Sequence, residues 1–300
     1  MPVTRSTGKP VPARVGLIAG WGRFPVVVAE SLAAQGCEVY CLGIKDHADP
    51  VLRSICHDYE PLGIARLGQA VRYFRRHGVE QATMAGKIHK VLLFQKWYWL
   101  KHFPDWEFVR TFYPHFITQT QDRKDDTMLG TFVQAFGRRG VRCVPATELV
   151  PGLLVAEGQL TGSPLTFGQR QDVAFGWQLA REMGRLDVGQ SVVVKGRAVL
   201  AVEAVEGTDE CIRRAGKLCP LGGFTVVKVA KPQQDMRFDV PTIGEGTLRT
   251  MAEAGGKVLA VEADRTILID QPAFVQVAQR LGITVVALRQ AQLAQEPAAA

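Results

Sequence analysis

Apolar positions in the first half of the chain alternate between short runs and helix-spaced patterns. Short apolar runs predict strands, and a repeat of about 3.6 residues predicts helices. Strands that alternate with helices are typical of a parallel sheet with helices on both faces. The expected strands are 14–19, 37–42, 81–84 and 141–144, and the expected helices are 25–35, 67–76, a stretch from Ile88 onward, and 124–138.

The second half mixes paired strands with helices and predicts a second α/β domain of the α+β kind. Gly196-Arg197 separates two apolar runs, which indicates a hairpin. The expected strands are 192–195, 198–203, 224–229, 235–240, 257–261, 266–269 and 283–288, and helices are expected at 169–183, from Asp209, and at 246–254.

Composition shifts divide the chain into two expected domains. Residues 150–167 carry five Gly or Pro and no clear period, so they are interpreted as a linker. The resulting division is a flexible N-terminus at 1–13, a Rossmann-like domain at 14–149, the linker, a C-terminal catalytic domain at 168–288 and a disordered tail at 289–300.

Composition and charge narrow the function classes. The 300 residues are 47% hydrophobic, yet no run of about 18 apolar residues predicts a membrane span. The first residues lack the apolar segment of a secretion signal, and the six cysteines form no Cys-x-x-Cys pair, so a cytoplasmic protein is expected. A net charge of +7 favours an acidic partner such as a nucleotide or anionic lipid. Nucleic acid is not expected, because no nucleic-acid-binding motif is present.

Residues 235–240 carry the most restrictive pattern. If this segment is extended, Asp235, Arg237 and Asp239 point to one side and apolar residues to the other. Pro241 should end the strand and leave Asp239 at its carboxyl end, where open α/β sheets bind ligands. The loop residues Thr242 and Gly244 follow directly, and Lys228 and Lys231 precede the segment. This arrangement suits chemistry on a phosphorylated substrate, and the alternative is a surface strand with solvated ion pairs.

A glycine loop follows the first expected strand. Gly20-Trp21-Gly22 would place backbone N–H groups and a helix N-terminus against a phosphate. Pro25 stands where the dinucleotide fingerprint has its third glycine, so a generic nucleotide or phosphate loop is expected, and a tight turn is an equal alternative. Lys87 is a further expected substrate-binding residue beside Gly20 and Gly22.

Adjacent acids begin the helix expected near residue 124. Asp125 and Asp126 would stabilise the helix dipole, which is the favoured interpretation. As the minority interpretation, the pair binds a divalent cation together with Asp239.

The segment 201–210 runs from a strand through a glycine into a helix. Gly207 and Thr208, the expected N-cap, would hold an anion there. Glu203, Glu206 and Asp209 could reach the same cleft, and plain helix capping is an equal alternative.

Aromatic residues concentrate between Phe94 and Phe116, which hold ten of the chain's 24. Lysine and arginine are interspersed among them, and this combination suits a membrane interface or an apolar ligand. The alternative is a helical hairpin that packs on the first sheet.

Several motifs together resemble one family. They are Gly-Leu-Ile-Ala-Gly-x-Gly-x-x-Pro, Lys-Asp-Asp, Asp187-Val-Gly-Gln-Ser-Val-Val-Val, Ala-Val-Glu-Ala-Val-Glu-Gly-Thr-Asp, and Lys-Pro-x-Gln-Asp-x-Arg-x-Asp-x-Pro-Thr-Ile-Gly. They are similar to those of the LpxI-type UDP-2,3-diacylglucosamine pyrophosphatases over about residues 14–288.

The resemblance implies hydrolysis of UDP-2,3-diacylglucosamine to UMP and 2,3-diacylglucosamine 1-phosphate (lipid X) in lipid A synthesis, with Mg²⁺ or another divalent cation. Asp239 matches the family's key carboxylate, and Asp235 matches a position where either acid occurs. Arg237, Lys228 and Lys231 would contact phosphate oxygens in an active site between the domains. The inner-membrane surface is the expected peripheral partner, and a homo-oligomer is left open.

Two other function classes stay open on the residues alone. A nucleotide-dependent oxidoreductase or sugar-nucleotide transferase would use the same glycine loop and, if an oxidoreductase, would retain NAD on purification. A non-catalytic nucleotide- or lipid-binding protein would release no UMP from the diacyl substrate.

Overall fold

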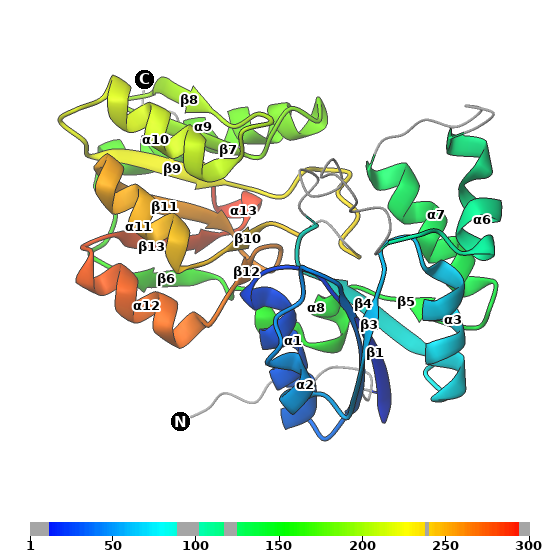
Figure 1. Cartoon of the computed structure of the whole chain (residues 1–300). Helices are drawn as coiled ribbons and strands as arrows, with labels where there is room; N and C mark the ends of the chain where they lie inside the picture. The colour runs from blue at the N-terminus through cyan, green and yellow to red at the C-terminus, as the bar shows by residue number, and fades with distance from the viewer. Residues whose placement is uncertain (1–11, 89–101, 117–124, 238–239, 294–300) are drawn as a thin grey trace. The chain divides into compact units, whose positions relative to one another are not determined.

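The computed structural model describes residues 12–88, 102–116, 125–237 and 240–293 (Figure 1). The chain folds as two units. The first comprises Met1–Pro151 with Asp235–Phe238, and the second comprises Gly152–Gln234 with Asp239–Ala300. A short 3-10 helix, Pro151–Leu153, lies where the chain passes from the first unit to the second.

The first unit is built on a parallel sheet with the strand order β3-β2-β1-β4-β5. Its strands are β1 (Arg14–Ala19), β2 (Glu38–Ile44), β3 (Asp58–Leu62), β4 (Gln81–Ala85) and β5 (Arg142–Cys143). Its helices are α1 (Arg23–Ala34), α2 (Leu52–Ile55), α3 (Leu67–Arg76), α6 (Trp106–Phe116), α7 (Asp125–Gly137) and α8 (Ala146–Leu149). Figure 1 shows α1, α2 and α8 on one side of the sheet and α3, α6 and α7 on the other. The expected alternation of strand and helix is therefore confirmed, with β3, α2 and α8 as additions to it. The helix expected from Ile88 onward lies partly outside the described residues.

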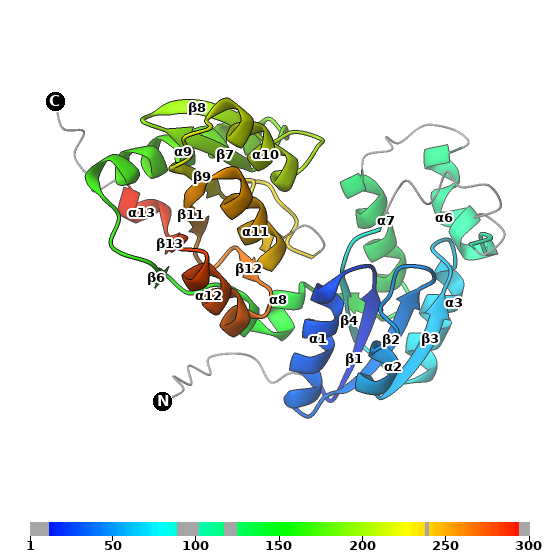
Figure 2. The same cartoon turned by 60° about the vertical axis from the view of Figure 1, so that its left-hand side comes forward.

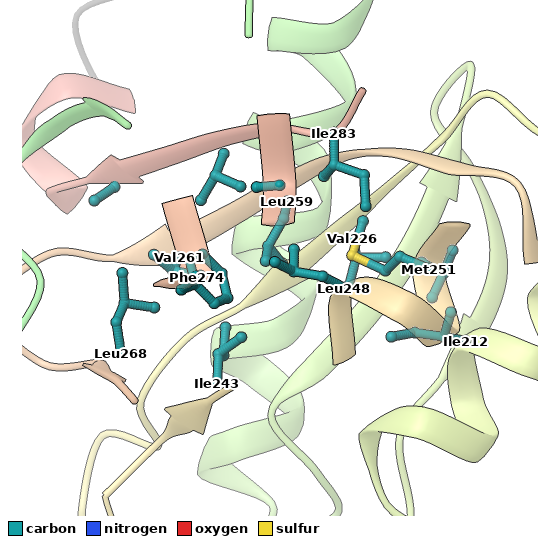
Figure 3. Close-up of a cluster of buried hydrophobic side chains, with 14 of the residues drawn as sticks. Ile212, Val226, Ile243, Leu248, Met251, Leu259, Val261, Leu268, Phe274 and Ile283 are labelled. Carbon is teal, nitrogen blue, oxygen red and sulfur yellow. The ribbon is translucent and has the colours of Figure 1, made fainter. Parts of the chain in front are cut away.

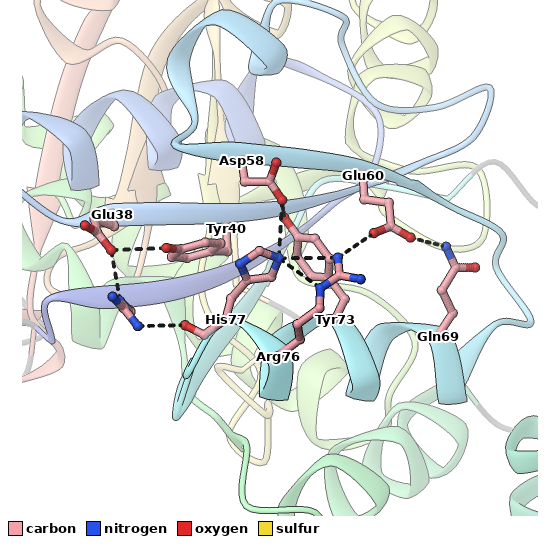
Figure 4. A network of polar contacts seen from close by, with 9 residues as sticks. Glu38, Tyr40, Asp58, Glu60, Gln69, Tyr73, Arg76 and His77 are labelled. Atoms are coloured by element: carbon pink, nitrogen blue, oxygen red, sulfur yellow. Dashed lines mark hydrogen bonds and ion pairs between the residues drawn. The ribbon is translucent and has the colours of Figure 1, made fainter.

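Strand β3 was not predicted, because its polar residues give no apolar strand pattern. Their side chains instead bond to helix α3 (Figure 4). Tyr73 Oη donates to Asp58 Oδ2 at 2.9 Å, and Gln69 Nε2 donates to Glu60 Oε1 at 2.7 Å. Burial, followed by the bond to Asp58, raises the pKa of Tyr73. Pro61 lies in the same strand, which is tolerated because β3 forms the edge of the sheet.

The second unit is built on a mixed sheet with the strand order β6-β13-β11-β9-β7-β8. Strand β11 pairs in parallel with β9 and β13, whereas β6, β7 and β8 pair antiparallel. The strands are β6 (Gly158–Thr161), β7 (Ser191–Lys195), β8 (Ala198–Val202), β9 (Phe224–Lys228), β11 (Gly256–Glu262) and β13 (Thr284–Leu288). A separate parallel pair joins β10 (Thr242–Ile243) to β12 (Ile267–Leu268).

Two apolar clusters hold helices to the two faces of this mixed sheet. Trp177 of α9 packs with valines on one face, and Ile212, Met251 and Phe274 belong to the cluster on the other (Figure 3). Figure 2 shows α10, α11 and α12 on the same side of this sheet. The helices are α9 (Phe167–Arg185), α10 (Thr208–Leu218), α11 (Glu245–Ala254), α12 (Gln271–Arg280) and α13 (Gln290–Leu293). The expected second α/β domain, including the hairpin of β7 and β8, is confirmed.

The segment interpreted as a linker contains a strand as well as the short 3-10 helix. Strand β6 pairs antiparallel with β13 at the edge of the second sheet. Thr161 Oγ1 donates to the carbonyl oxygen of Ile283 at 2.8 Å and accepts from the amide of Val285 at 3.0 Å. These long-range bonds explain why a segment without a clear apolar period is nevertheless ordered as a strand.

The described helices also bear on the membrane question. None of those in the described ranges is both long enough and apolar enough to cross a bilayer.

Candidate active site

In the first unit, the glycine loop and Lys87 meet at the carboxyl ends of neighbouring strands. Gly20 follows β1 and donates its amide to the carbonyl oxygen of Ala85, at the end of β4, at 2.8 Å. Trp21 and Lys87 exchange two backbone hydrogen bonds of 2.8 and 3.0 Å. The strand order reverses between β1 and β4, and such switch points are where open α/β sheets bind ligands.

The glycines of this loop have separate structural reasons. A Cβ on Gly20 would lie 2.8 Å from the carbonyl oxygen of Lys87, so only glycine allows this close approach. Gly22 is the N-cap of α1 at φ 106°, and a Cβ there would meet open space. Helix α1 has neither a side-chain cap nor an acid in its first turn. Its N-terminal amides would therefore suit an anion, and the phosphate-binding role of the loop stays a prediction.

In the second unit, Lys228 and Thr208 form the centre of a buried polar cluster. Lys228 lies at the end of β9 and is only 6% exposed. Its Nζ donates to Thr208 Oγ1 at 2.9 Å and to the carbonyl oxygen of Thr242, in β10, at 3.4 Å. Three predicted substrate-binding residues from separate elements are thereby brought together.

Thr208 is the first residue of α10, so its prediction as the N-cap is wrong. Gly207 takes the cap position at φ 84°, because a residue with no Cβ adopts this positive φ at low cost. The Thr208 hydroxyl is thereby free to donate to Glu203 Oε1 at 2.9 Å. Gly244, another predicted site residue, is the N-cap of α11 and also makes no side-chain cap bond.

Glu203 completes the cluster, and the sequence left its role open. Glu203 is only 8% exposed, and its Oε2 receives no hydrogen bond from the described part of the chain. A buried carboxylate oxygen without a donor is costly, so this oxygen suits a donor brought by water or a ligand. The other two candidate acids have different partners: Glu206 pairs with Arg214, and Asp209 accepts from Thr247.

Ser191 also belongs to this cluster, and the sequence analysis did not predict it as a site residue. Its Oγ lies 3.4 Å from Thr208 Oγ1, and the residue is fully buried at the start of β7. A serine at the start of an apolar run gives no local signal of such a role. Only the pairing of β7 with β9, which places Ser191 opposite Lys228, reveals it.

Lys231 has a different environment from Lys228. Its Nζ forms a 2.7 Å ion pair with Asp187 Oδ1, and its amide donates to Gln234 Oε1 at 2.9 Å. The Lys231 side chain is about one quarter exposed. Asp187 belongs to one of the motifs that carried the family resemblance, and holding Lys231 gives that motif a structural role.

The strand expected at 235–240 is wrong over its described part. Residues 235–237 form a turn, in which the Arg237 amide donates to Asp235 Oδ1 at 3.0 Å. Aspartate side chains often capture a backbone amide two residues ahead, and this local bond competes with strand pairing. Alternation of charged and apolar residues was therefore a misleading signal here.

Asp235 and Arg237 form a close ion pair, and both residues belong to the first unit. Arg237 Nε lies 2.9 and 3.0 Å from the two Asp235 oxygens. The Arg237 guanidinium lowers the pKa of Asp235, and the carboxylate raises the pKa of Arg237. Asp235 is thus kept ionised as the partner of Arg237. A role as a proton-accepting base is less suited to such a pair than a role in positioning the arginine.

Asp239 and Phe238 lie outside the described residues. The chain on the carboxyl side of Asp239 is anchored: Thr242 Oγ1 donates to the Val240 carbonyl oxygen at 2.9 Å. The Ile267 amide donates to the carbonyl oxygen of Pro241 at 2.8 Å, which ties this segment to β12. The catalytic role of Asp239 stays a prediction.

The candidate metal ligands Asp125 and Asp126 open α7, and their side chains lie outside the described part. Among the residues that are described, no group of three or more His, Cys, Asp or Glu side chains is placed to hold a metal ion. A metal site with Asp239, Asp125 and Asp126 therefore stays a prediction.

The aromatic segment divides into core and surface where it is described. Phe112 is buried, and its ring centroid lies 5.3 Å from that of Phe132 in α7. On the same helix, Trp106 is 77% and Tyr113 49% exposed. Phe112 thus packs in the core, as one interpretation expected, whereas the membrane interface stays a prediction. Trp97 and Trp99 lie outside the described residues.

Comparison with known proteins covers nearly the whole chain. Residues 14–153 match the sequence model of the LpxI N-terminal domain, and residues 156–286 match that of the LpxI C-terminal domain. A curated protein of Caulobacter vibrioides, UDP-2,3-diacylglucosamine pyrophosphatase LpxI, is 30% identical over 285 residues. That alignment covers 91% of this chain and 96% of the relative. The two domains built around the glycine loop and the Lys228 cluster therefore belong to a member of the LpxI family.

Proposed function

We propose that this protein hydrolyses UDP-2,3-diacylglucosamine to UMP and 2,3-diacylglucosamine 1-phosphate. The observation that carries the proposal is similarity over 91% of the chain to a relative named UDP-2,3-diacylglucosamine pyrophosphatase, together with both LpxI domain matches. The chemistry of the Lys228 cluster supports it, because a pyrophosphate needs buried positive charge and oriented donors. In this proposal the enzyme acts in lipid A biosynthesis.

The reaction is written as an in-line displacement at the phosphorus on the sugar side. A water oxygen bonds to that phosphorus while the bond between the phosphorus and the bridging oxygen breaks. The bridging oxygen leaves as part of UMP, and the proton lost by the water passes to Asp239 or to solvent. Asp239 orients the attacking water in this scheme.

Two cationic groups of the chain are assigned to the phosphates. Lys228 is assigned to phosphate oxygens from the end of β9. Arg237, whose Nε edge holds the Asp235 carboxylate, is assigned to them through the other edge of its guanidinium. Thr208 and Glu203 fix the position of the Lys228 side chain through the chain of hydrogen bonds described above. They are positioning residues in this scheme.

The direct test is hydrolysis in ¹⁸O-labelled water with products separated by mass spectrometry. We expect one label in 2,3-diacylglucosamine 1-phosphate and none in UMP. Absence of UMP release would contradict the hydrolase, and label in UMP would move the attack to the other phosphorus. NAD retained on the purified protein, without hydrolysis, would favour the oxidoreductase alternative.

A divalent cation, Mg²⁺ by preference, is proposed as the cofactor. Carboxylate oxygens of Asp239, Asp125 and Asp126 are the donors expected from the sequence, and hard oxygen donors are what Mg²⁺ prefers. Within the described residues, the unpartnered Oε2 of Glu203 is a further oxygen of the same chemistry. Such an ion neutralises charge on pyrophosphate oxygens when bound.

Stripping divalent cations from the protein should reduce turnover at saturating substrate by roughly a hundredfold, because unneutralised phosphate charge opposes the developing transition state. Turnover is followed as UMP release in excess chelator and again after Mg²⁺ is restored. Addition of Na⁺ at matched ionic strength is the control. Full activity in excess chelator would remove the cation from the proposal and leave charge neutralisation to Lys228 and Arg237.

Contact with the inner-membrane surface is proposed for the exposed side of α6. Trp106, Val109 and Tyr113 are spaced at helical intervals and are all at least two fifths exposed, with Arg110 exposed beside them. An apolar stripe beside a cationic residue suits the boundary between headgroups and acyl chains. A diacyl substrate would be reached from there.

Replacing Trp106 and Tyr113 together by serine should weaken binding to anionic vesicles by roughly tenfold, since aromatic side chains of about 150–250 Å² would no longer enter the interface. Cosedimentation with vesicles containing phosphatidylglycerol measures this, and wild-type binding should fall with salt. The matched control is Phe167→Ser, at an exposed aromatic residue of the second unit. Equal cosedimentation of both variants would assign Trp106 and Tyr113 to ordinary surface.

A further inference from the structure

Two cysteines of the first unit lie together, and the site described above uses neither of them. All six cysteines of the chain are described, and all are free thiols. Cys41 lies in the middle of β2 and is fully buried, whereas Cys56 follows α2 as its C-cap and is partly exposed. A pair of thiols that solvent can reach from one side has redox chemistry that a single cysteine lacks.

The fold of the first unit brings these two cysteines to one face of its sheet. Successive side chains of a strand point to opposite faces, and Leu42 belongs to the apolar cluster that includes the core residues of α3. Cys41 therefore points to the other face, where α2 lies (Figure 1). The chain leaves α2 at Cys56 and joins the sheet beside β2, since the His57 amide donates to the Val39 carbonyl oxygen at 2.9 Å.

The two side chains are in direct contact. The Cys41 thiol donates a hydrogen bond to the sulfur of Cys56. This bond stabilises the Cys56 thiolate and lowers the pKa of Cys56, against the opposite effect of burial. The same bond raises the pKa of Cys41, and burial raises it further. Cys56 is therefore the nucleophile of the pair, and Cys41 is its protonated neighbour.

The other four cysteines have different surroundings. Burial raises the pKa of Cys37, and it raises the pKa of Cys143 and of Cys211 to about 12. The Cys219 thiol donates to the carbonyl oxygen of Gly222 at 3.5 Å. Among the six thiols, the described contacts thus pair only Cys41 with Cys56.

We propose that Cys41 and Cys56 are a modification site for hydrogen peroxide, at which the two thiols close into a reversible disulfide. The Cys56 thiolate attacks one peroxide oxygen and the O–O bond breaks, which gives a sulfenic acid and a hydroxide that takes up a proton as water. The Cys41 sulfur then bonds to the Cys56 sulfur, and the sulfenic oxygen leaves as water with the Cys41 proton. The two sulfurs lose two electrons to peroxide, and a dithiol restores them.

The disulfide would protect Cys56 from irreversible oxidation. A sulfenic acid that persists reacts with more peroxide to form a sulfinic acid, which thiol reductants do not reverse. Cys41 competes with that second oxidation, because its sulfur is already in contact with Cys56. The cross-link also closes residues 41–56 into a loop and ties the end of α2 to β2.

Peptide mapping of the full-length protein by mass spectrometry tests the proposal. The reduced protein is treated with hydrogen peroxide, alkylated while denatured and digested with trypsin. We expect two peptides joined through Cys41 and Cys56, which dithiothreitol separates again. Cys37 lies in the same tryptic peptide as Cys41, so Cys37→Ser should keep the linkage and thereby identify the sulfur.

Three further variants assign the roles. In Cys41→Ala, Cys56 should accumulate sulfenic acid, which dimedone traps, and then sulfinic acid that dithiothreitol does not reverse. Cys56→Ser should leave Cys41 unmodified, since that thiol is buried and protonated. Cys219→Ser changes a partly exposed cysteine of the second unit, and as the matched control it should form the Cys41–Cys56 linkage as the parent does.

The result that would overturn the proposal is equally direct. Peroxide could leave Cys56 unmodified in the parent, convert it to sulfinic acid before any linkage forms, or join it to a cysteine other than Cys41. Each of these outcomes would refute the disulfide, and equal recovery of free Cys56 in the parent and in Cys41→Ala would refute the protection. No readout involves hydrolysis, so these results are independent of the proposed function.

Discussion

Replacement of Asp239 by alanine is expected to reduce turnover by a hundredfold or more, the usual order for the loss of a group that orients the attacking water or neutralises charge. Asp239 is the acid directly before the segment Val240–Ile243, which hydrogen bonds anchor to β12. A carboxylate next to an anchored backbone can be held in one position, as catalysis requires. Steady-state UMP release measures the effect.

The Asp239→Ala test needs evidence that only chemistry is lost. UMP affinity and the melting temperature of the variant should match those of the parent, since the side chain is assigned to the water and not to the nucleotide. Asp264→Ala provides the control, because this exposed aspartate of the second unit pairs with Arg289. A variant that keeps a tenth of parental turnover would exclude Asp239 as the key carboxylate.

The elements predicted best are those whose own residues determine them. Helix α3 was placed at its observed bounds, because an apolar stripe along Leu67–Arg76 meets the core on one side. The hairpin of β7 and β8 followed from two apolar runs around Gly196-Arg197, and both residues adopt positive φ in that turn. In these cases local sequence and tertiary packing favour the same structure.

Prediction failed where side-chain bonds override the apolar pattern. In β3, Asp58 and Glu60 look like loop residues, yet helix α3 supplies their hydrogen-bond donors. At Asp235, the pattern of alternation predicted a strand, but the side chain captures the Arg237 amide and forms a turn. Neither bond can be read from apolar periodicity.

The structure groups candidate site residues that the sequence could name only one by one, and their role in substrate binding stays a prediction. Lys228, Thr208 and Thr242 were all expected to bind substrate, and their mutual contacts depend on how β9, α10 and β10 pack. Among the acids Glu203, Glu206 and Asp209, only the fold shows that Glu203 shares the hydroxyl of Thr208. Sequence order gives no measure of such distances.

Lys228→Met is expected to lower kcat/KM by roughly a hundredfold, because the proposal assigns this buried ammonium group to phosphate oxygens in a site of low dielectric. The free energy of unfolding should also fall, by up to about 3 kcal/mol, since the nearby Glu203 carboxylate would stay buried without this cation. Enzyme kinetics and urea unfolding measure the two effects. Lys217→Met, at an exposed lysine of α10, is the matched control.

The double variant Lys228→Met with Glu203→Gln separates the catalytic effect from the structural one. Neutralising Glu203 removes the uncompensated buried charge, so the double variant should recover most of the lost unfolding free energy. Its kcat/KM should stay as low as that of Lys228→Met, because glutamine does not replace the ammonium group that the proposal assigns to phosphate. If activity returned together with stability, Lys228 would be a structural partner of Glu203 and not a phosphate ligand. If stability did not return, the coupling of the two charges through Thr208 would be refuted.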